Sequence, residues 1–323
     1  MRRTLLLAAA ALAACNTGFE PQYRVRDVRI LAISSHAQGS NAADVLPGDT
    51  LVLKALVANP LNRVGLTVDW VACLPQQSEA LSPCLDQAYL RDPASLVAAV
   101  GTVPGVVSLG SGTCSSESCT SAVSFPLPDV TAALEFAIYA AQVEPTFECR
   151  LYAQLVVVAI ASAEGHASTS YKRVQIKPTA AELAAASPPV SDRYVLNLNP
   201  TVGDVRRNPT DPDACIGGDT VMGGGGALPF PAGQVVLCGR GGDGSIGTYD
   251  LCDPGGGTDP ASESLDWQWY VTEGEFPDEG GGVGDARGGH VTFQRPAGGF
   301  KLWTIVRDGR GGVDWAAYTF LPL

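Results

Sequence analysis

The sequence predicts an all-β protein made of two antiparallel β-sandwich domains. The chain of 323 residues contains 37 glycines and 23 prolines, which interrupt it at short intervals. The segments between these interruptions are rich in β-branched and aromatic residues, and convincing helical periodicity is rare. Short segments of this composition, separated by turn residues, are typical of antiparallel β structure.

The chain begins with a segment typical of export. Arg2 and Arg3 are followed by an apolar run of ten residues, 5–14. A run of that length is too short to cross a membrane, which takes about 20 apolar residues. Together with its basic start, the run matches a secretory signal peptide. We therefore expect the chain to leave the cytoplasm.

The end of this segment, LAAC at residues 12–15, resembles the lipobox of bacterial lipoproteins. The resemblance implies a signal peptide over residues 1–14, cleavage before Cys15, and attachment of palmitate-like acyl chains to that cysteine. Two or three acyl chains hold a protein stably at a membrane, so residues 15–24 are expected to form a lipidated tether. Asn16, in place of the aspartate that retains such proteins at the inner membrane, favours the cell outer membrane. The alternative is an ordinary secretion signal with a chance cysteine.

The charge of the chain narrows the choice of partners. Loss of Arg2 and Arg3 with the signal peptide leaves 19 basic residues against 33 acidic ones, a formal charge of −14. Nucleic acids and anionic lipid surfaces are bound through basic patches. We therefore expect no nucleic-acid partner, and contact with the membrane only through the lipid anchor.

The remaining eight cysteines predict disulfide bonds. They are Cys73, Cys84, Cys114, Cys119, Cys149, Cys215, Cys238 and Cys252. An even number in an exported chain indicates disulfides, and the absence of CxxC spacing argues against zinc. The expected local pairs are Cys73–Cys84, Cys114–Cys119 and Cys238–Cys252, which would leave Cys149 to pair with Cys215. A Cys73–Cys149 bridge between the two sheets of the first domain is the alternative.

The first domain is expected over residues 25–178 with seven strands. They are placed at 25–34, 50–58, 65–73, 121–126, 134–142, 149–162 and 168–177. Each is an apolar or β-branched run bounded by turn residues. Residues 74–120 are expected to form a disulfide-braced, partly irregular insertion. Residues 163–166 are expected to form the hairpin turn between the last two strands.

A linker over residues 179–192 separates the two domains. Residues 179–186 can form two helical turns, and the proline-rich residues 187–191 predict a stiff extended hinge. The second domain, 193–323, repeats the plan of the first. Its strands are expected at 194–199, 234–239, 265–272, 290–295, 300–307 and 313–321.

Residues 265–321, which include WQWYVTEGEF and FKLWTIVRDGRGGVDW, resemble bacterial Ig-like and PKD-like domains. Domains of this family carry a tryptophan on a central strand and end in a Gly-rich hairpin. The first domain resembles them through its strand order and through Asp69-Trp70, which corresponds to Asp266-Trp267. The resemblance implies two Ig-like sandwiches and no particular activity.

Four tryptophans are concentrated in the second domain: Trp267, Trp269, Trp303 and Trp315. Alternate strand positions share a face, and large aromatic side chains on such a face usually point into the core. We expect these side chains to be buried. The alternative is an exposed stacking platform for sugars.

Motifs for catalysis or nucleotide binding are weak in this sequence. Gly242, Gly244 and Gly247 spell GxGxxG after a strand, but no helical pattern follows to receive a pyrophosphate. No GxSxG nucleophile motif occurs, and no pair of histidines has the spacing of a zinc helix. We therefore expect a protein that is not an enzyme and binds no dinucleotide.

No cofactor is expected from the sequence, and calcium is the alternative that the acidic loops offer. Candidate ligands lie in Gly/Pro-rich loops: Asp211, Asp213, Asp219, Asp243, Asp250 and Asp253. Calcium is bound by six to eight oxygen atoms in such flexible loops. Aspartate and glycine also favour turns by themselves, which is the alternative explanation.

Together these observations predict a non-catalytic envelope lipoprotein that acts as an interaction or structural module. Its partner would be an unidentified protein or polysaccharide. Two alternatives remain: a calcium-dependent carbohydrate-binding or adhesive surface lipoprotein, and a hydrolase or hydrolase accessory protein.

Overall fold

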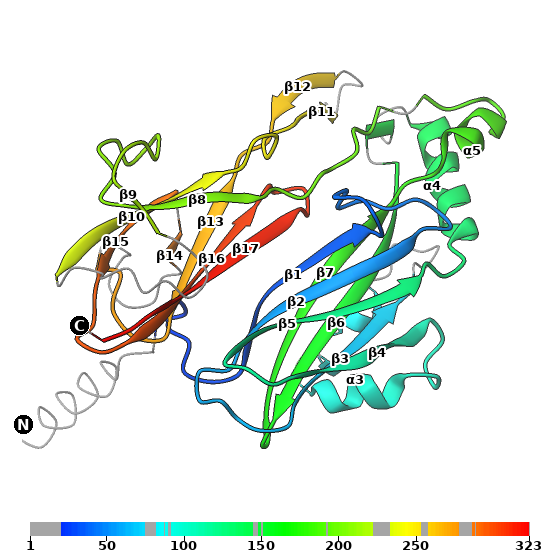
Figure 1. Ribbon diagram of the computed structural model, residues 1–323. Helices are drawn as coiled ribbons and strands as arrows, with labels where there is room; N and C mark the ends of the chain where they lie inside the picture. Colours follow the sequence, from blue (N-terminus) through cyan, green and yellow to red (C-terminus); the bar gives the residue numbers. More distant parts are fainter. Residues whose placement is uncertain are drawn as a thin grey trace, which may run out of the picture.

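The computed structural model describes residues 21–74, 82–86, 88–89, 92–144, 148–149, 151–191, 193–221, 233–252, 258–277, 286–287 and 289–322. Most of the regular structure is β-strand, and every named strand pairing is antiparallel, so the predicted all-β fold is confirmed. Figure 1 shows two sandwiches side by side, with the helices at the edges of the first. Within the described ranges, no helix is both long enough and apolar enough to cross a membrane.

The first sandwich consists of a three-stranded sheet, β1-β2-β5, packed on a four-stranded sheet, β4-β3-β6-β7. Its strands are β1 (Arg29–Ala37), β2 (Thr50–Ala58), β3 (Leu66–Cys73), β4 (Val106–Cys114), β5 (Ser118–Pro126), β6 (Ala153–Ala163) and β7 (His166–Ile176). Glu164 and Gly165 form the predicted hairpin turn, and both have positive φ angles. Trp70 lies fully buried in the core between the two sheets.

The second sandwich consists of two four-stranded sheets, β15-β10-β8-β9 and β14-β13-β16-β17. Its strands are β8 (Val202–Arg207), β9 (Asp219–Thr220), β10 (Gln234–Gly241), β13 (Asp266–Val271), β14 (Ala286–Arg287), β15 (His290–Gln294), β16 (Phe300–Arg307) and β17 (Val313–Phe320). A separate hairpin of β11 (Thr248–Cys252) and β12 (Thr258–Ser262) extends from it.

The two sandwiches share one connectivity. With β9 and the β11–β12 hairpin set aside, the strands of each can be numbered one to seven along the chain. Strands one, two and five then form one sheet, and strands four, three, six and seven form the other. This is the arrangement of an immunoglobulin-like sandwich, in which strands A, B and E face strands C, F and G. The repeat predicted from the sequence is therefore a repeat of topology.

Several predicted elements are wrong. Residues 134–142 are not a strand but part of helix α4 (Thr131–Val143), which buries Leu134 and Ala141, seven positions apart and therefore on one helical face. Its five alanines also favour a helix over a strand. The insertion contains the regular elements η1 (Pro83–Leu85), α3 (Pro93–Ala99) and β4. Residues 194–199 form no strand, whereas β8 was not predicted.

The predicted linker packs against the first sandwich, where Leu183 is buried with Ala141 and Leu151. It begins with the short helix α5 (Ala180–Ala185), which a Thr179–Glu182 capping box starts. The Asn197 backbone N–H then donates to the buried Asp44 carboxylate at 2.8 Å. The Asn199 side chain donates to the Ser35 carbonyl at 2.8 Å and accepts from the Val313 backbone at 3.0 Å. These contacts tie residues 197–199, which follow the linker, to both sandwiches.

The segment that enters β1 first passes through the second sandwich. Tyr23, which the sequence places in the tether, is buried in the second core and contacts Phe276 at a ring-centroid distance of 4.9 Å. Val25 donates a backbone hydrogen bond to Val271, and Val271 donates one to Tyr23. Residues 23 and 24, which the sequence assigns to a tether, therefore contact the second sandwich, and the chain passes along that sandwich before it enters β1.

Three disulfides are described. Cys73–Cys84 and Cys114–Cys119 form the local pairs that the sequence suggests. The expected Cys238–Cys252 and Cys149–Cys215 pairs are wrong, because Cys215 pairs with Cys238 in the same domain. Cys149 is also disulfide-bonded. The alternative Cys73–Cys149 bridge is excluded by Cys73–Cys84.

Candidate functional site

The two sandwiches meet along a buried apolar seam. The outer faces of β1 and β2 supply Leu31, Ala32, Leu56 and Ala58, and the segment before β1 supplies Val25. The second sandwich supplies Tyr270, Trp303, Ile305 and Val313, with Trp315 at the edge. The Trp303 indole N–H donates to the Ser118 hydroxyl across the seam at 3.0 Å. Because large apolar side chains are shared in this way, the two sandwiches form one body.

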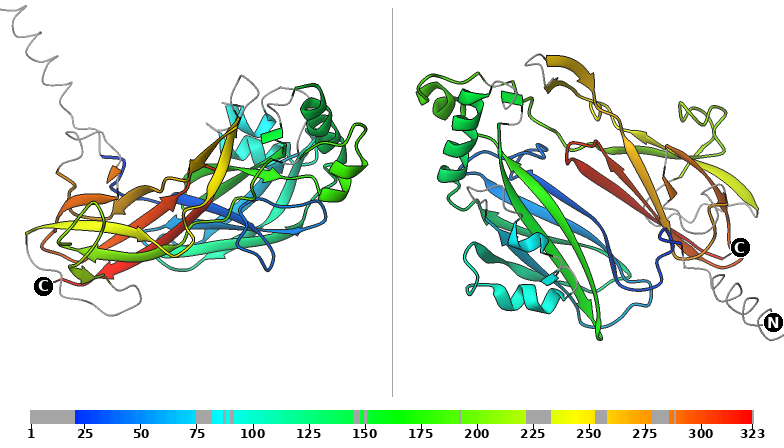
Figure 2. Two further views of the ribbon diagram at one scale, coloured as in Figure 1. Left: turned by 90° about the horizontal axis from the view of Figure 1, so that it is seen from above. Right: turned by 180° about the vertical axis from the view of Figure 1, so that it is seen from behind.

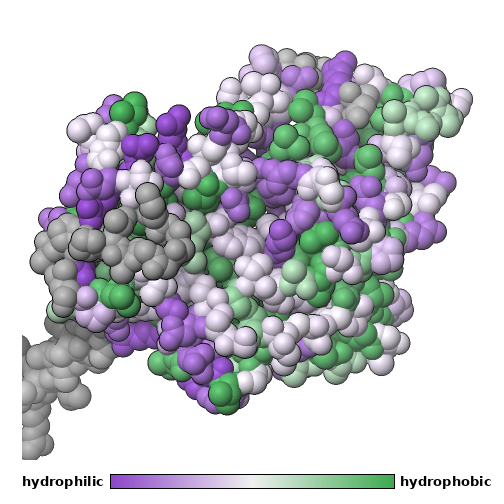
Figure 3. All heavy atoms as spheres, viewed as in Figure 1, coloured by the Kyte–Doolittle hydropathy of each residue, from purple (hydrophilic) through white to green (hydrophobic). Residues whose placement is uncertain are grey.

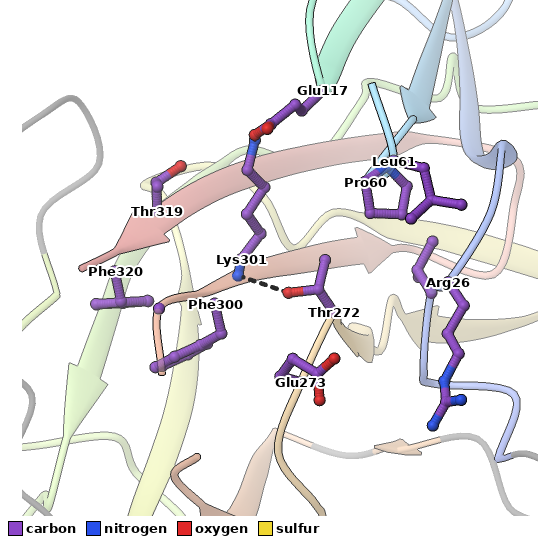
Figure 4. Close-up of a pocket in the computed structure, with 12 residues that line it drawn as sticks. Arg26, Pro60, Leu61, Glu117, Thr272, Glu273, Phe300, Lys301, Thr319 and Phe320 are labelled. Carbon is purple, nitrogen blue, oxygen red and sulfur yellow. Dashed lines mark hydrogen bonds and ion pairs between the residues drawn. The ribbon is translucent and has the colours of Figure 1, made fainter. Parts of the chain in front are cut away.

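A groove of about 630 Å³, which we call the tether-side groove, opens at the end of the seam next to Val25. Its walls come from the segment before β1, from the β2–β3 loop, and from β16 and β17 (Figure 4). Phe300 and Phe320 form an apolar base, with stacked rings 4.6 Å apart. Leu61 stands at the rim and is 60% exposed.

Charged groups border this groove. Lys301 pairs with Glu117 from the first sandwich, and its backbone N–H donates to the Thr272 hydroxyl at 3.0 Å. Arg26 and Glu273 project from the two opposite domains at the open side (Figure 4). An apolar base within a charged rim is the composition of a small protein-binding surface.

A second cleft of about 460 Å³, which we call the polar cleft, lies between β1 and β2 of the first sandwich and β17 of the second. Ser34 and His36 of β1 and Lys54 of β2 form one wall. Asp314 and Trp315 of β17 form the other, with Asn41, Thr120, Asn199 and Thr201 around them. Hydrophilic and hydrophobic side chains are interspersed over the face of the molecule in Figure 3. Burial and the nearby Lys54 lower the pKa of His36, so its imidazole is neutral at pH 7.

A third, smaller pocket of about 260 Å³ lies beside the Arg310 guanidinium. This group stands over the rings of Tyr194 and Tyr249, at 5.3 and 4.7 Å from their centroids, and pairs with the buried Glu263 at 2.8 Å. Arg310 lies in the turn between β16 and β17, and these contacts join that turn to Tyr194, which follows the linker, and to the β11–β12 hairpin. The guanidinium of Arg310 thus interacts with other residues of the chain, so the pocket is a structural junction.

Two buried ionisable groups support this junction. Burial raises the pKa of Asp44 to about 6, against the lowering effect of its hydrogen bond from Asn197. Burial lowers the pKa of Lys172 to about 8, although the Asp308 carboxylate opposes that shift. The Lys172 ammonium donates to the Gly311 carbonyl of the second sandwich. Both groups thus join elements that are distant in sequence.

The structure does not bring the predicted calcium ligands together. Asp211 caps a tight turn, Asp213 lies 3.4 Å from His290, and Asp219 pairs with Arg207. Asp243 is exposed, and Asp250 lines the pocket beside Arg310, whereas Asp253 lies outside the described residues. Among the residues that the structure describes, no three His, Cys, Asp or Glu side chains are grouped to hold a metal ion.

The remaining sequence motifs have structural roles, with one exception. Trp267, Trp269 and Trp303 are buried, as predicted, whereas Trp315 is only partly buried against the seam and keeps part of its ring exposed. The Gly-rich loop leads from β10 into β11 without a helix, and the Gly242 N–H donates to the Thr201 carbonyl. Cys15 lies outside the described residues.

No family model and no curated protein matches the chain. Among solved structures, the chain is similar to the mouse nectin-like molecule 4 ectodomain, with 10% identity over 94% of this chain and 65% of that chain and a TM-score of 0.17. It is similar to latent PorU from Porphyromonas gingivalis, with 11% identity over 92% of this chain and 24% of that chain and a TM-score of 0.22. A chicken T-cell receptor matches with 8% identity, coverage of 90% and 99%, and a TM-score of 0.22. At such TM-scores these similarities carry no argument, so the immunoglobulin-like architecture rests on the strand connectivity itself.

Sequence reasoning missed both clefts. Each cleft is formed by side chains from two domains. The alternation of the strands predicts that these side chains point away from the core, but it does not predict what they face. The signal that could have found the seam is the run of apolar residues in β1, β2 and β16, where outward positions are as apolar as inward ones. A strand buried on both faces reads as a continuous apolar run.

Proposed function

We propose that the chain is a non-catalytic lipoprotein of the bacterial envelope, anchored through Cys15, whose two fused sandwiches bind a protein partner in the tether-side groove. The observation that carries this proposal is the position of Tyr23. Only residues 16–22 separate the expected lipid anchor from a side chain that is buried in the second core.

This short connection constrains how the protein stands at its membrane. Seven residues span at most about 25 Å when fully extended. The second sandwich and the tether-side groove are therefore held close to the lipid surface. The helices α4 and α5 lie at the far end of the molecule from the first described residues, drawn in dark blue (Figure 2). A groove in the membrane-proximal position suits a partner that is itself part of the envelope.

The lipid anchor is tested by the Cys15→Ser variant. We expect the wild-type protein to incorporate labelled palmitate and to sediment with the outer membrane, and the variant to do neither. Asn16→Ser is the matched control, since it changes the neighbouring residue and keeps the thiol. A Cys15→Ser variant that still incorporates label would contradict the anchor.

The groove is tested separately by photo-crosslinking in intact cells. A photoreactive amino acid replaces Leu61 at the rim of the groove or Glu135 on the exposed face of α4. We expect a discrete envelope-protein adduct from position 61 and none from position 135. Equal labelling at both positions, or no adduct at 61, would contradict a partner in the groove.

A further inference from the structure

We propose that the polar cleft between β1, β2 and β17 is a binding site for a saccharide unit that carries a carboxylate group. The site is separate from the tether-side groove and does not depend on the function proposed for it. Its volume of about 460 Å³ lies within the ~300–1,000 Å³ that is usual for small-molecule sites.

The first argument is that several polar side chains in the cleft form no hydrogen bond or ion pair within the part of the protein that the structure describes. Among the described residues, the Ser34 hydroxyl, the His36 imidazole and the Lys54 ammonium have no hydrogen-bond or ion-pair partner. Ser34 and Lys54 face each other across the β1–β2 pairing, so both are held on rigid strands. The cleft thus offers hydroxyl, imidazole and ammonium groups in fixed positions, which is what recognition of a ring with many hydroxyls requires.

The second argument is the aromatic side chain beside these groups. Trp315 is partly buried against the seam and lines the cleft. An indole combines a flat apolar face with one polar N–H. A pyranose ring has an apolar C–H face and a rim of hydroxyls, so it can stack on the indole while its hydroxyls reach His36 and Ser34.

The third argument concerns charge. Lys54 is a cation without a partner in a protein whose net charge is −12. The carboxylate that also lines the cleft, Asp314, accepts a hydrogen bond from the Val202 backbone at 2.8 Å, so it is directed at the fold. A ligand carboxylate beside Lys54 would form a charge-assisted hydrogen bond, which is about twice as strong as a neutral one.

The experiment measures binding to the acylated full-length protein in nanodiscs by calorimetry. The probes are a trimer of galacturonic acid, the matching neutral galactose trimer, and an acidic peptide of glutamate residues. We expect the acidic trimer to bind about tenfold more tightly than the neutral one, the gain from one charged hydrogen bond. We expect the peptide not to bind.

Two variants assign the binding to the cleft. Lys54→Gln should remove the tenfold preference and leave the affinity for the neutral trimer unchanged, whereas Lys54→Arg should retain the preference. Trp315→Ala should weaken both trimers, and Tyr139→Ala on the exposed face of α4 is the aromatic control. Because Trp315 also contacts the seam, Trp315→Phe is the version that preserves packing, and its affinity should be intermediate.

Several results would overturn the proposal. They are an absence of saccharide binding at millimolar concentration, equal affinity for the acidic and neutral trimers in the wild type, a preference that survives Lys54→Gln, or binding of the peptide in place of the sugars.

Discussion

The two sandwiches have the same connectivity, but their cores are filled by different kinds of side chain. The first core consists mainly of Val, Ile, Leu and Ala; among its described residues Trp70 is the one fully buried aromatic side chain, and the partly buried Phe125 packs against it. The second core is half aromatic, with Tyr23, Trp269, Phe276, Phe293, Phe300, Tyr318 and Phe320. The first has strands of eight to eleven residues, and the strands of the second have two to eight.

Glycines make room for the rings in the second sandwich. A Cβ atom on Gly239 would lie 2.4 Å from the Trp267 ring, and one on Gly274 would lie 2.6 Å from the Phe293 ring. The first sandwich contains one comparable position, where a Cβ on Gly112 would meet the Ser121 hydroxyl. Strand order and inward–outward alternation therefore set the topology, while the volume of the core can be filled by many small side chains or by few large ones.

The largest expected effect comes from removing one core side chain from each sandwich. Phe293→Ala should lower the free energy of unfolding by about 3–5 kcal/mol, and Leu155→Ala by about 2–5 kcal/mol. Phe293 should cost more because its ring also contacts Phe276 and Phe300, each at 5.2 Å between centroids. Urea unfolding of both variants checks the order, and a larger loss in Leu155→Ala would refute the distinction between the two cores.

A second pair of variants isolates the role of glycine. Gly274→Ala should cost at least about 2 kcal/mol, because its φ of 102° strains an alanine and the new Cβ meets Phe293. Gly165→Ala in the first sandwich has a similar φ of 80° but open space around it, so it should cost only about 1 kcal/mol. Thermal melting compares the two. Equal losses would show that ring clearance at Gly274 is unimportant.

A smaller effect is expected where the linker meets the first sandwich. The pKa of Asp44 in the folded protein is about 6, above its usual value of 3.8, so ionising Asp44 costs the folded state free energy. Its stabilising contribution is complete below pH 3.8 and is lost as the pH rises through 6. The stability of Asp44→Asn relative to the wild type should therefore rise by about 2–3 kcal/mol between pH 4 and pH 7. Parallel stability profiles would contradict this.

The smallest effect is expected from chelation. Because the described aspartates of the second domain are dispersed, EDTA should shift the melting temperature by less than about 1 °C. A shift of several degrees that added calcium reverses would instead support the calcium site predicted from the sequence, with Asp253 as a member. Equimolar magnesium controls for general salt effects.

The sequence was sufficient for the fold class and for most strands with strong β-branched runs. The predicted range 50–58 coincides with β2, and 300–307 coincides with β16. It failed where local composition misleads. The alanine-rich residues of α4 also satisfied a strand pattern, and β4 contains SLGSGT, which reads as a loop. The pairing of Cys215 with Cys238 and the two clefts depend on segments brought together only by the complete fold, so no local pattern encodes them.

The course of the first described residues through the second sandwich also affects how the protein is made. Arg24 donates a hydrogen bond to the Gly274 carbonyl, a contact that spans 250 positions of the chain. Domains generally fold in the order of their synthesis, at about 5–20 residues per second. The first sandwich can close once β7 has emerged, but residues 23–25 must wait for β13. The acylation proposed for Cys15 would therefore precede the joining of the two sandwiches, which is complete only after the C-terminal half has been made.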